Sequence, residues 1–97
     1  MLESELTMRK ELNNIFGEDL RILAIQTRDR LHITQKEMGE KLYMSESSYS
    51  DIETGRSHCS MPTAILLLEM QEDPKSFLQS SVRKATGQEG KEVQLVR

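Results

Sequence analysis

The stretch TQKEMGEKLYMSESSYSDIETG, residues 34–55, decides the fold of this chain. Thr34 is a good helix N-cap, and Glu37 three residues later completes a capping box, so the sequence predicts a helix over residues 35–42. Gly39 costs about 1 kcal/mol in the interior of that helix relative to Ala. This cost is explained if the backbone of another helix passes very close to Gly39.

The second half of the stretch predicts another short helix. Ser45 is its expected N-cap, and the helix should end near Thr54 because Gly55 suits the left-handed position that follows a helix. Tyr43 and Met44 form the turn before it. The stretch therefore predicts two helices joined by a turn, with the second helix presented outward.

Helices are also predicted on both sides of this pair. Apolar residues at steps of three and four predict a core helix over residues 18–31. Residues 1–16 carry a weaker apolar stripe and predict a separate helix, with a break or bend at Gly17. Ser60 is the expected N-cap of a fourth core helix. That helix is apolar on most of its circumference, so we expect it to be the most buried one.

The C-terminal part of the chain predicts a fifth helix and a tail. Asp73 and Pro74 suit an N-cap and a first helical position, and the helix they open should extend to about Ala85. Residues 86–97 contain two glycines and alternating charges, which predict a flexible tail. The expected organisation is all-α, with an N-terminal helical flank at 1–16, a helical domain at 17–85 and a tail at 86–97.

The composition argues against several classes of function. The 97 residues fit one small domain, with a net charge of −3, one cysteine and two histidines. No apolar run is long enough to cross a membrane or to act as a secretory signal, so a cytoplasmic location is expected. A zinc site would need acidic ligands as well. Since no arrangement of catalytic residues, phosphate-binding glycine loop or metal cluster is present, we expect no enzyme activity, no metal and no cofactor.

The helix pair resembles the helix-turn-helix of the Cro/C1-type repressors, also called the XRE family. The likeness covers roughly residues 18–72. It rests on Thr-Gln opening the first helix, a small residue five positions after that Thr, Ser at the cap of the second helix, and Ile-Glu-x-Gly at its end. The resemblance implies a five-helix, lambda-repressor-like, all-α domain and a DNA-binding transcription regulator. Its recognition helix would be residues 45–54, lying in the major groove.

The resemblance also implies roles for individual side chains. Base contacts are expected from the outward side chains of the recognition helix, which are Glu46, Ser47, Ser50 and Asp51. Phosphate contacts are expected from Gln35, Ser45, Ser48, Arg56 and Ser57, and Gln35 is also expected to brace the recognition helix. Arg28 and Glu53 match a pair that forms an internal ion pair in some members of the family, so we expect these two residues to be structural.

Two residues depart from the family pattern in the turns. The family usually has Gly where Tyr43 stands, so we expect the turn to be longer or less left-handed. The usual Gly before Ile33 is His32.

The charge of the core allows two functions. Residues 18–71 contain six basic and nine acidic residues, and we expect weak binding to random DNA because Lys and Arg supply most non-specific affinity. Acidic side chains can accept from cytosine N4, and serine can pair with several base edges. The first expectation is therefore a sequence-specific regulator on a palindromic operator. The alternative is a protein-interaction module, antitoxin-like or an adaptor, whose serine-rich helix faces a protein partner.

A homodimer is expected, through one of two apolar surfaces. The candidates are Leu2, Leu6 and Leu12 in the N-terminal stripe, and Phe77, Leu78 and Val82 in the fifth helix. The alternative is that Phe77 and Leu78 only close the core of a monomer.

Overall fold

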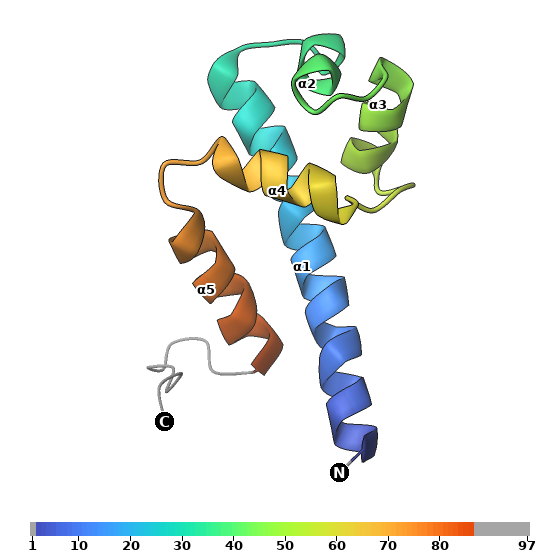
Figure 1. The fold of residues 1–97 in the computed structure, drawn as a ribbon, viewed down its shortest axis with the longest axis vertical. Coiled ribbons are helices and arrows are strands. Elements are labelled where there is room, and N and C mark those ends of the chain that lie inside the picture. Colours follow the sequence, from blue (N-terminus) through green and yellow to red (C-terminus); the bar gives the residue numbers. More distant parts are fainter. Residues whose placement is uncertain (1, 87–97) are drawn as a thin grey trace. The chain divides into compact units, whose positions relative to one another are not determined.

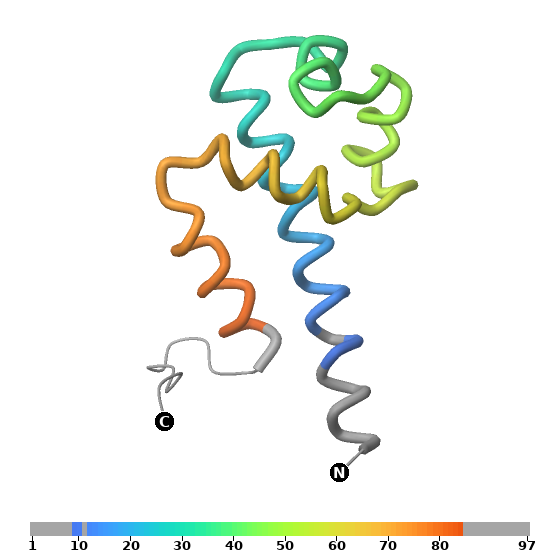
Figure 2. Tube along the Cα trace, viewed as in Figure 1, coloured from blue at the N-terminus to red at the C-terminus, as the bar shows by residue number. Residues whose placement is uncertain are grey.

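The computed structural model describes residues 2–86, and the side chains in that range other than those of residues 2–8, 11, 85 and 86. Within this range the chain forms helices and no strands (Figures 1 and 2). The helices are α1 (Leu2–Leu31), α2 (Gln35–Lys41), α3 (Glu46–Thr54), α4 (Met61–Glu69) and α5 (Pro74–Thr86). The predicted all-α class is confirmed. The predicted tail lies outside the described residues, apart from Thr86, which ends α5.

The predicted break at Gly17 was wrong. α1 runs without interruption for 30 residues, from Leu2 to Leu31. A glycine inside a helix costs only about 1 kcal/mol, which neighbouring helical residues and tertiary packing readily offset. Gly17 also lies against the loop before α4, because a Cβ atom built on it would stand 3.4 Å from His58 Nδ1.

The chain divides into two compact units. One unit is Gly17–Glu72, which we call the central unit; the other combines the described parts of Met1–Phe16 and Asp73–Arg97. In this second unit the rings of Phe16 and Phe77 lie 5.9 Å apart, centroid to centroid, and are tilted by 51°. Such an edge-tilted aromatic pair is a favourable packing geometry.

The core of the central unit is small and mostly aliphatic. Its buried apolar side chains are Leu20, Ala24, Met38, Leu42, Tyr49, Ile52, Ala64 and Leu67. The helices α1, α3 and α4 each contribute two of them, and α2 contributes Met38, with Leu42 directly after its end. All four helices therefore take part in the core. Thr27 is buried among them, and its hydroxyl oxygen accepts a hydrogen bond of 2.9 Å from Gln71 Nε2.

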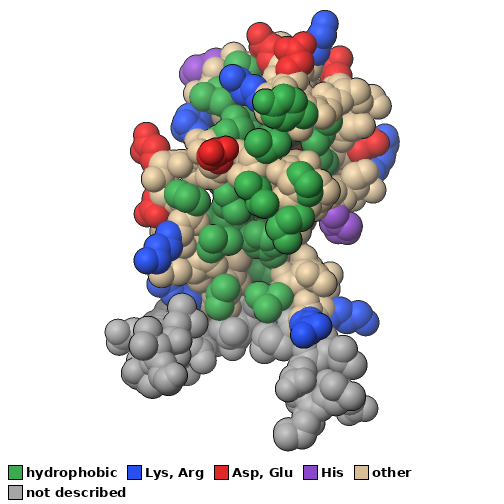
Figure 3. All heavy atoms as spheres, in the orientation of Figure 1, with side chains coloured by type: hydrophobic (Ala, Val, Ile, Leu, Met, Phe, Trp, Pro, Cys, Tyr) green, Lys and Arg blue, Asp and Glu red, His purple; other side chains and the backbone are tan. Residues whose placement is uncertain are grey.

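The fourth core helix, α4, buries more of its residues than α2 or α3, as the sequence predicts, but it is buried on one face only. Ala64 and Leu67 of α4 are buried, but Met61 is 71% exposed and Ile65 is 57% exposed. Apolar side chains reach the surface over α4 in Figure 3. A nine-residue helix at the side of a small core can bury only one face, so an apolar circumference does not imply full burial.

Candidate nucleic-acid interface

The N-termini of α2 and α3 are fixed by side chains, as the sequence predicts. Thr34 Oγ1 accepts from the backbone N–H of Glu37 at 3.1 Å, and Glu37 Oε1 accepts from the N–H of Thr34 at 2.9 Å. Ser45 Oγ accepts from the N–H of Ser48 at 3.1 Å. These caps satisfy backbone donors that a helix start leaves free, and they fix where each helix begins.

Gly39 explains how tightly α2 and α3 are joined. A Cβ atom at this position would lie 2.9 Å from Met44 O, closer than real Cβ atoms come, and 3.1 Å from Ser45 O, tighter than most real contacts. The close approach predicted from the sequence is therefore present. The approaching backbone is that of the turn and the N-cap of α3, so α3 starts directly against α2.

The turn between α2 and α3 is left-handed, contrary to our expectation. Tyr43 has φ of 60°. Its N–H donates to Glu40 O at 3.2 Å, and the N–H of Met44 donates to Gly39 O at 2.9 Å. These two bonds form a Schellman motif with Tyr43 at the position that glycine usually occupies. The turn therefore keeps its geometry without the glycine.

The same motif ends two other helices of the central unit. At the end of α1, His32 has φ of 57°, and the N–H of Ile33 donates to Arg28 O. At the end of α3 the left-handed residue is Gly55, with φ of 83°. Three helix ends thus share one conformation, and only that of α3 has the residue that adopts it without cost.

The carboxylate of Glu53 joins three helices. Arg28, on α1, donates from Nε to Glu53 Oε2 at 2.7 Å and from Nη2 to Oε1 at 3.2 Å. Gln35, the first residue of α2, donates from Nε2 to Oε1 at 2.9 Å. The Tyr49 hydroxyl, on α3 itself, donates to Oε2 at 2.5 Å. Through the bonds of Glu53 to Arg28 and Gln35, the C-terminal half of α3 is held against both α1 and α2. Arg28 also donates to Ile33 O, in the loop after α1.

The ionisation of this cluster follows from its contacts. Burial would raise the pKa of Glu53, but the hydrogen bonds from Arg28, Tyr49 and Gln35 outweigh it and leave the pKa below its usual value. Burial, followed by the bond to the Glu53 carboxylate, raises the pKa of Tyr49. The same carboxylate raises the pKa of Arg28. At neutral pH the cluster therefore consists of one cation, one anion and two neutral donors.

The opposite face of α3 is open and polar. Glu46 and Ser47 are exposed, and Ser50 and Asp51 are half-exposed. Arg56, just beyond the helix, is exposed and lies with Nη1 3.6 Å from Asp51 Oδ1. The four residues expected to contact bases thus share one accessible surface. α3 is fixed on its inner side and presents donors and acceptors on its outer side.

Comparison with known families identifies the helix pair. Residues 25–70 match the model of a helix-turn-helix family. The matching family is the Cro/C1-type helix-turn-helix, also called the XRE family. The matched residues span the C-terminal end of α1, residues 25–31, and all of α2, α3 and α4. No curated protein and no solved structure matched the chain.

The match gives the domain a general function. The Cro/C1-type family is lambda-repressor-like, all-α and DNA-binding, and its members are regulators that are usually not enzymes. The chain therefore carries a DNA-binding regulatory domain. None of the described helices is both long and apolar enough to cross a membrane.

The side chains that we expected to contact phosphate differ in how free they are. Ser57 and Arg56 are exposed, whereas the Gln35 amide nitrogen is bound to Glu53. The hydroxyl groups of Ser45 and Ser48 are exposed and lie 3.0 Å from each other. The structure thus places these residues around α3, with one of the two N–H donors of the Gln35 amide bound to Glu53.

Sequence reasoning missed two exposed lysines of the Cro/C1-type domain. Lys36 and Lys41 lie on α2, and among the described residues neither has an acidic partner. Other cations of the central unit are engaged: Arg21 with Glu18, Arg28 with Glu53, and Arg30 with Met70 O. The lysines were counted as charge but not assigned, because no spacing in the sequence distinguishes a free cation from a paired one. Figure 3 shows acidic side chains over α2 as well.

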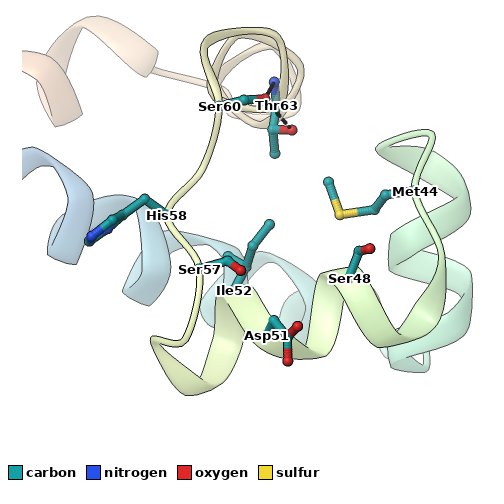
Figure 4. Close-up of a pocket in the computed structure, with 8 residues that line it drawn as sticks. All are labelled: Met44, Ser48, Asp51, Ile52, Ser57, His58, Ser60 and Thr63. Carbon is teal, nitrogen blue, oxygen red and sulfur yellow. Dashed lines mark hydrogen bonds between the residues drawn. The ribbon is translucent and has the colours of Figure 1, made fainter.

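A shallow pocket opens beside α3 and the start of α4 (Figure 4). Met44, Ile52 and Thr63 point toward one another across it, whereas Asp51 points to the other side of α3. The remaining lining residues are Ser48, Ser57, His58 and Ser60. Among the described residues, no group of three His, Cys, Asp or Glu side chains could hold a metal ion.

The residues proposed for dimerisation are only partly described. The side chains of Leu2 and Leu6 lie outside the described residues, and Leu12 is half-buried. On α5, Phe77 and Val82 are half-buried and Leu78 is 39% exposed. The contact of Phe77 with Phe16 gives that ring a partner within its own chain.

Proposed function

We propose that the chain is a sequence-specific transcription regulator, which places α3 in the major groove of DNA and binds a palindromic operator as a dimer. The observation that supports it best is the arrangement of α3. Its inner side is bound to α1 and α2 through Glu53, and its outer side presents Glu46, Ser47, Ser50 and Asp51. A recognition helix needs both a rigid base and accessible polar groups.

The outer side chains favour particular base edges. Carboxylates accept from cytosine N4, and serine hydroxyls donate to or accept from several bases. Glu46 and Asp51 therefore favour cytosine, and they disfavour phosphate contacts at wrong sites through charge repulsion. In this proposal phosphate contacts come from Arg56, Ser57, Ser45 and Ser48, together with the exposed Lys36 and Lys41 of α2.

Dimerisation supplies affinity that the net charge of −3 does not. Two domains on half-sites about one helical turn apart bind with the avidity of a bivalent ligand. The apolar surfaces proposed for this contact are Leu2, Leu6 and Leu12 on α1 and Phe77, Leu78 and Val82 on α5.

Selection from random duplexes tests the proposal. We expect the chain to enrich one palindromic sequence at low and at moderate salt, and the double variant Ser47→Ala with Asp51→Ala to lose this enrichment while remaining folded by circular dichroism. The matched control is Lys75→Ala on α5, which should enrich the same sequence. A folded parent chain that enriches nothing at low salt contradicts the proposal.

The acidic surface favours a second candidate function. Glu37, Glu40 and Glu46 are exposed on α2 and α3, and a duplex repels such a surface. In this alternative the helix-turn-helix binds a protein, as an antitoxin-like or adaptor module does. The selection experiment separates the two functions, since the alternative predicts no enriched duplex from a folded chain.

A further inference from the structure

Tyr43 occupies a backbone conformation that is unfavourable for its type. Its φ of 60° lies in the left-handed region, which is unfavourable for a residue with a Cβ atom. Gly55 takes the equivalent position at the end of α3 without this cost. Glycine at position 43 would therefore fit the backbone better than tyrosine does.

Packing does not compensate for this conformation. The Tyr43 side chain is 84% exposed, the largest exposure among the large apolar side chains of the described residues. Its hydroxyl has no hydrogen-bond partner among those residues. By contrast, Tyr49 is fully buried and bonded to Glu53. The ring at position 43 thus contributes little to the folded state of the free chain.

The position of Tyr43 is next to the outward end of α3. Only Met44 separates it from Ser45, the N-cap of α3, and the exposed Glu46 and Ser47 follow directly. The close approach at Gly39 fixes the turn to α2, so the backbone that carries the ring is rigid. A strained residue whose exposed side chain is carried at such an edge, by a turn packed against α2, points to a contact outside the chain.

We propose that Tyr43 is a DNA contact whose hydroxyl donates a hydrogen bond to a backbone phosphate. This inference rests on the proposed function. Tyrosine is among the side chains that contact phosphate oxygens in protein–DNA complexes. A hydroxyl is an uncharged hydrogen-bond donor. It can therefore contact phosphate on a surface that has few free cations; on α2 these cations are Lys36 and Lys41.

Paired substitutions test this contact on the full chain. We use Tyr43→Phe, which removes only the hydroxyl, and Tyr43→Gly, which also removes the ring and relieves the backbone. His32→Gly is the matched control, because it relieves the same conformation at the end of α1. We measure the melting temperature of each variant. We also measure its affinity for two duplexes, the selected one and one in which the operator sequence is altered.

The expected pattern separates binding from stability. Tyr43→Phe should weaken binding to both duplexes about three- to ten-fold, which is the worth of one neutral hydrogen bond, and should leave the melting temperature unchanged. Tyr43→Gly should bind at least as weakly as Tyr43→Phe, yet melt about 4 °C higher. His32→Gly should also melt higher and keep the affinity of the parent chain.

Two results would overturn the proposal. If the parent chain binds its selected duplex and Tyr43→Phe binds it equally well, the hydroxyl makes no phosphate contact and this inference alone fails. If the folded parent chain selects no duplex, the proposed function fails and this inference fails with it. A loss confined to one base pair of the operator would also contradict a phosphate contact, since phosphate contacts carry no sequence information.

Discussion

A single carboxylate determines how α3 is held. Glu53 accepts hydrogen bonds from Arg28, Gln35 and Tyr49, which belong to three different helices. Its side chain is only 8% exposed, and that of Arg28 is 27% exposed. A charged group in this setting stabilises the fold only while all its partners are present.

Glu53→Gln should therefore destabilise the chain. The amide cannot accept four hydrogen bonds, and Arg28 would keep a poorly compensated charge, so we expect a loss of about 2–4 kcal/mol in the free energy of unfolding. Chemical denaturation of both chains measures it. Glu46→Gln, an exposed change on the same helix, is the control and should alter stability by less than about 0.5 kcal/mol. Equal midpoints for Glu53→Gln and the parent chain would show that the cluster is not stabilising.

The same carboxylate predicts a dependence on acid pH. The pKa of Glu53 is lower in the folded chain than in the unfolded chain, so folding favours the ionised form. Its contribution is fully present above the unfolded pKa of about 4.3 and is lost as the pH falls through the lower, folded value. The melting temperature of the parent chain should fall more steeply below about pH 4.5 than that of Glu53→Gln. Parallel curves for the two chains would contradict this assignment.

At the scale of the helices, the short-range signals in the sequence were reliable. The capping residues Thr34, Ser45 and Ser60 are the N-caps in the structure, and Gly55 ends α3. These signals are local, because each depends on hydrogen bonds within one turn of the helix. Gly17 misled the prediction for the opposite reason: whether a helix continues through a glycine depends on packing and neighbours rather than on the residue itself.

Gly39→Ala tests how closely α2 and α3 are joined. Alanine normally stabilises a helix by about 1 kcal/mol relative to glycine. Here its Cβ atom would meet two backbone oxygens, at 2.9 and 3.1 Å, so the turn before α3 must move. We expect a net loss of about 1–3 kcal/mol in stability and weaker DNA binding. Thermal unfolding and the duplex titration measure the two effects.

Gly17→Ala is the matched control for Gly39→Ala. Its new Cβ atom would lie 3.4 Å from the His58 ring, an ordinary contact with a side chain. The helical preference of alanine should then prevail and raise stability by about 0.5–1 kcal/mol. If both variants were stabilised, the approach of the turn to Gly39 would be looser than described.

At the scale of the whole molecule, charge should limit the salt dependence of binding. Lys36, Lys41 and Arg56 are the exposed cations near α2 and α3. If each contacts one phosphate, the plot of log K against log salt should have a slope of about −3 per subunit. Lys36→Gln and Lys41→Gln should each make the slope shallower by about 0.9, whereas Lys75→Gln on α5 should not change it. Fluorescence anisotropy across a salt series measures all four chains.

A much steeper slope for the parent chain would contradict this count. A value near −6 per subunit would mean that about twice as many cations reach the phosphates. Basic residues beyond the central unit would then have to take part, and the assignment of the interface to α2 and α3 would be incomplete.

The sequence predicted the candidate interface less completely than the fold. Residues of α3 were assigned outward positions from helical spacing and the family resemblance, and they are accessible in the structure. The family resemblance implies that Gln35 braces the recognition helix, but local spacing does not identify its partner, Glu53, which lies 18 residues away. Nor does the sequence reveal that Tyr43 keeps the left-handed conformation expected only of glycine. Both features depend on tertiary contacts, which lie beyond the reach of local signals.

The two tyrosines also make the chain its own spectroscopic probe. The chain contains no tryptophan, so ultraviolet emission comes from Tyr43 and Tyr49 alone. Tyr49 is enclosed and its hydroxyl touches a carboxylate, a setting that quenches phenol fluorescence, whereas Tyr43 faces water. Unfolding should therefore increase the emission of Tyr49, and a ligand bound at the turn should decrease the emission of Tyr43. The two events could be followed in one unlabelled sample.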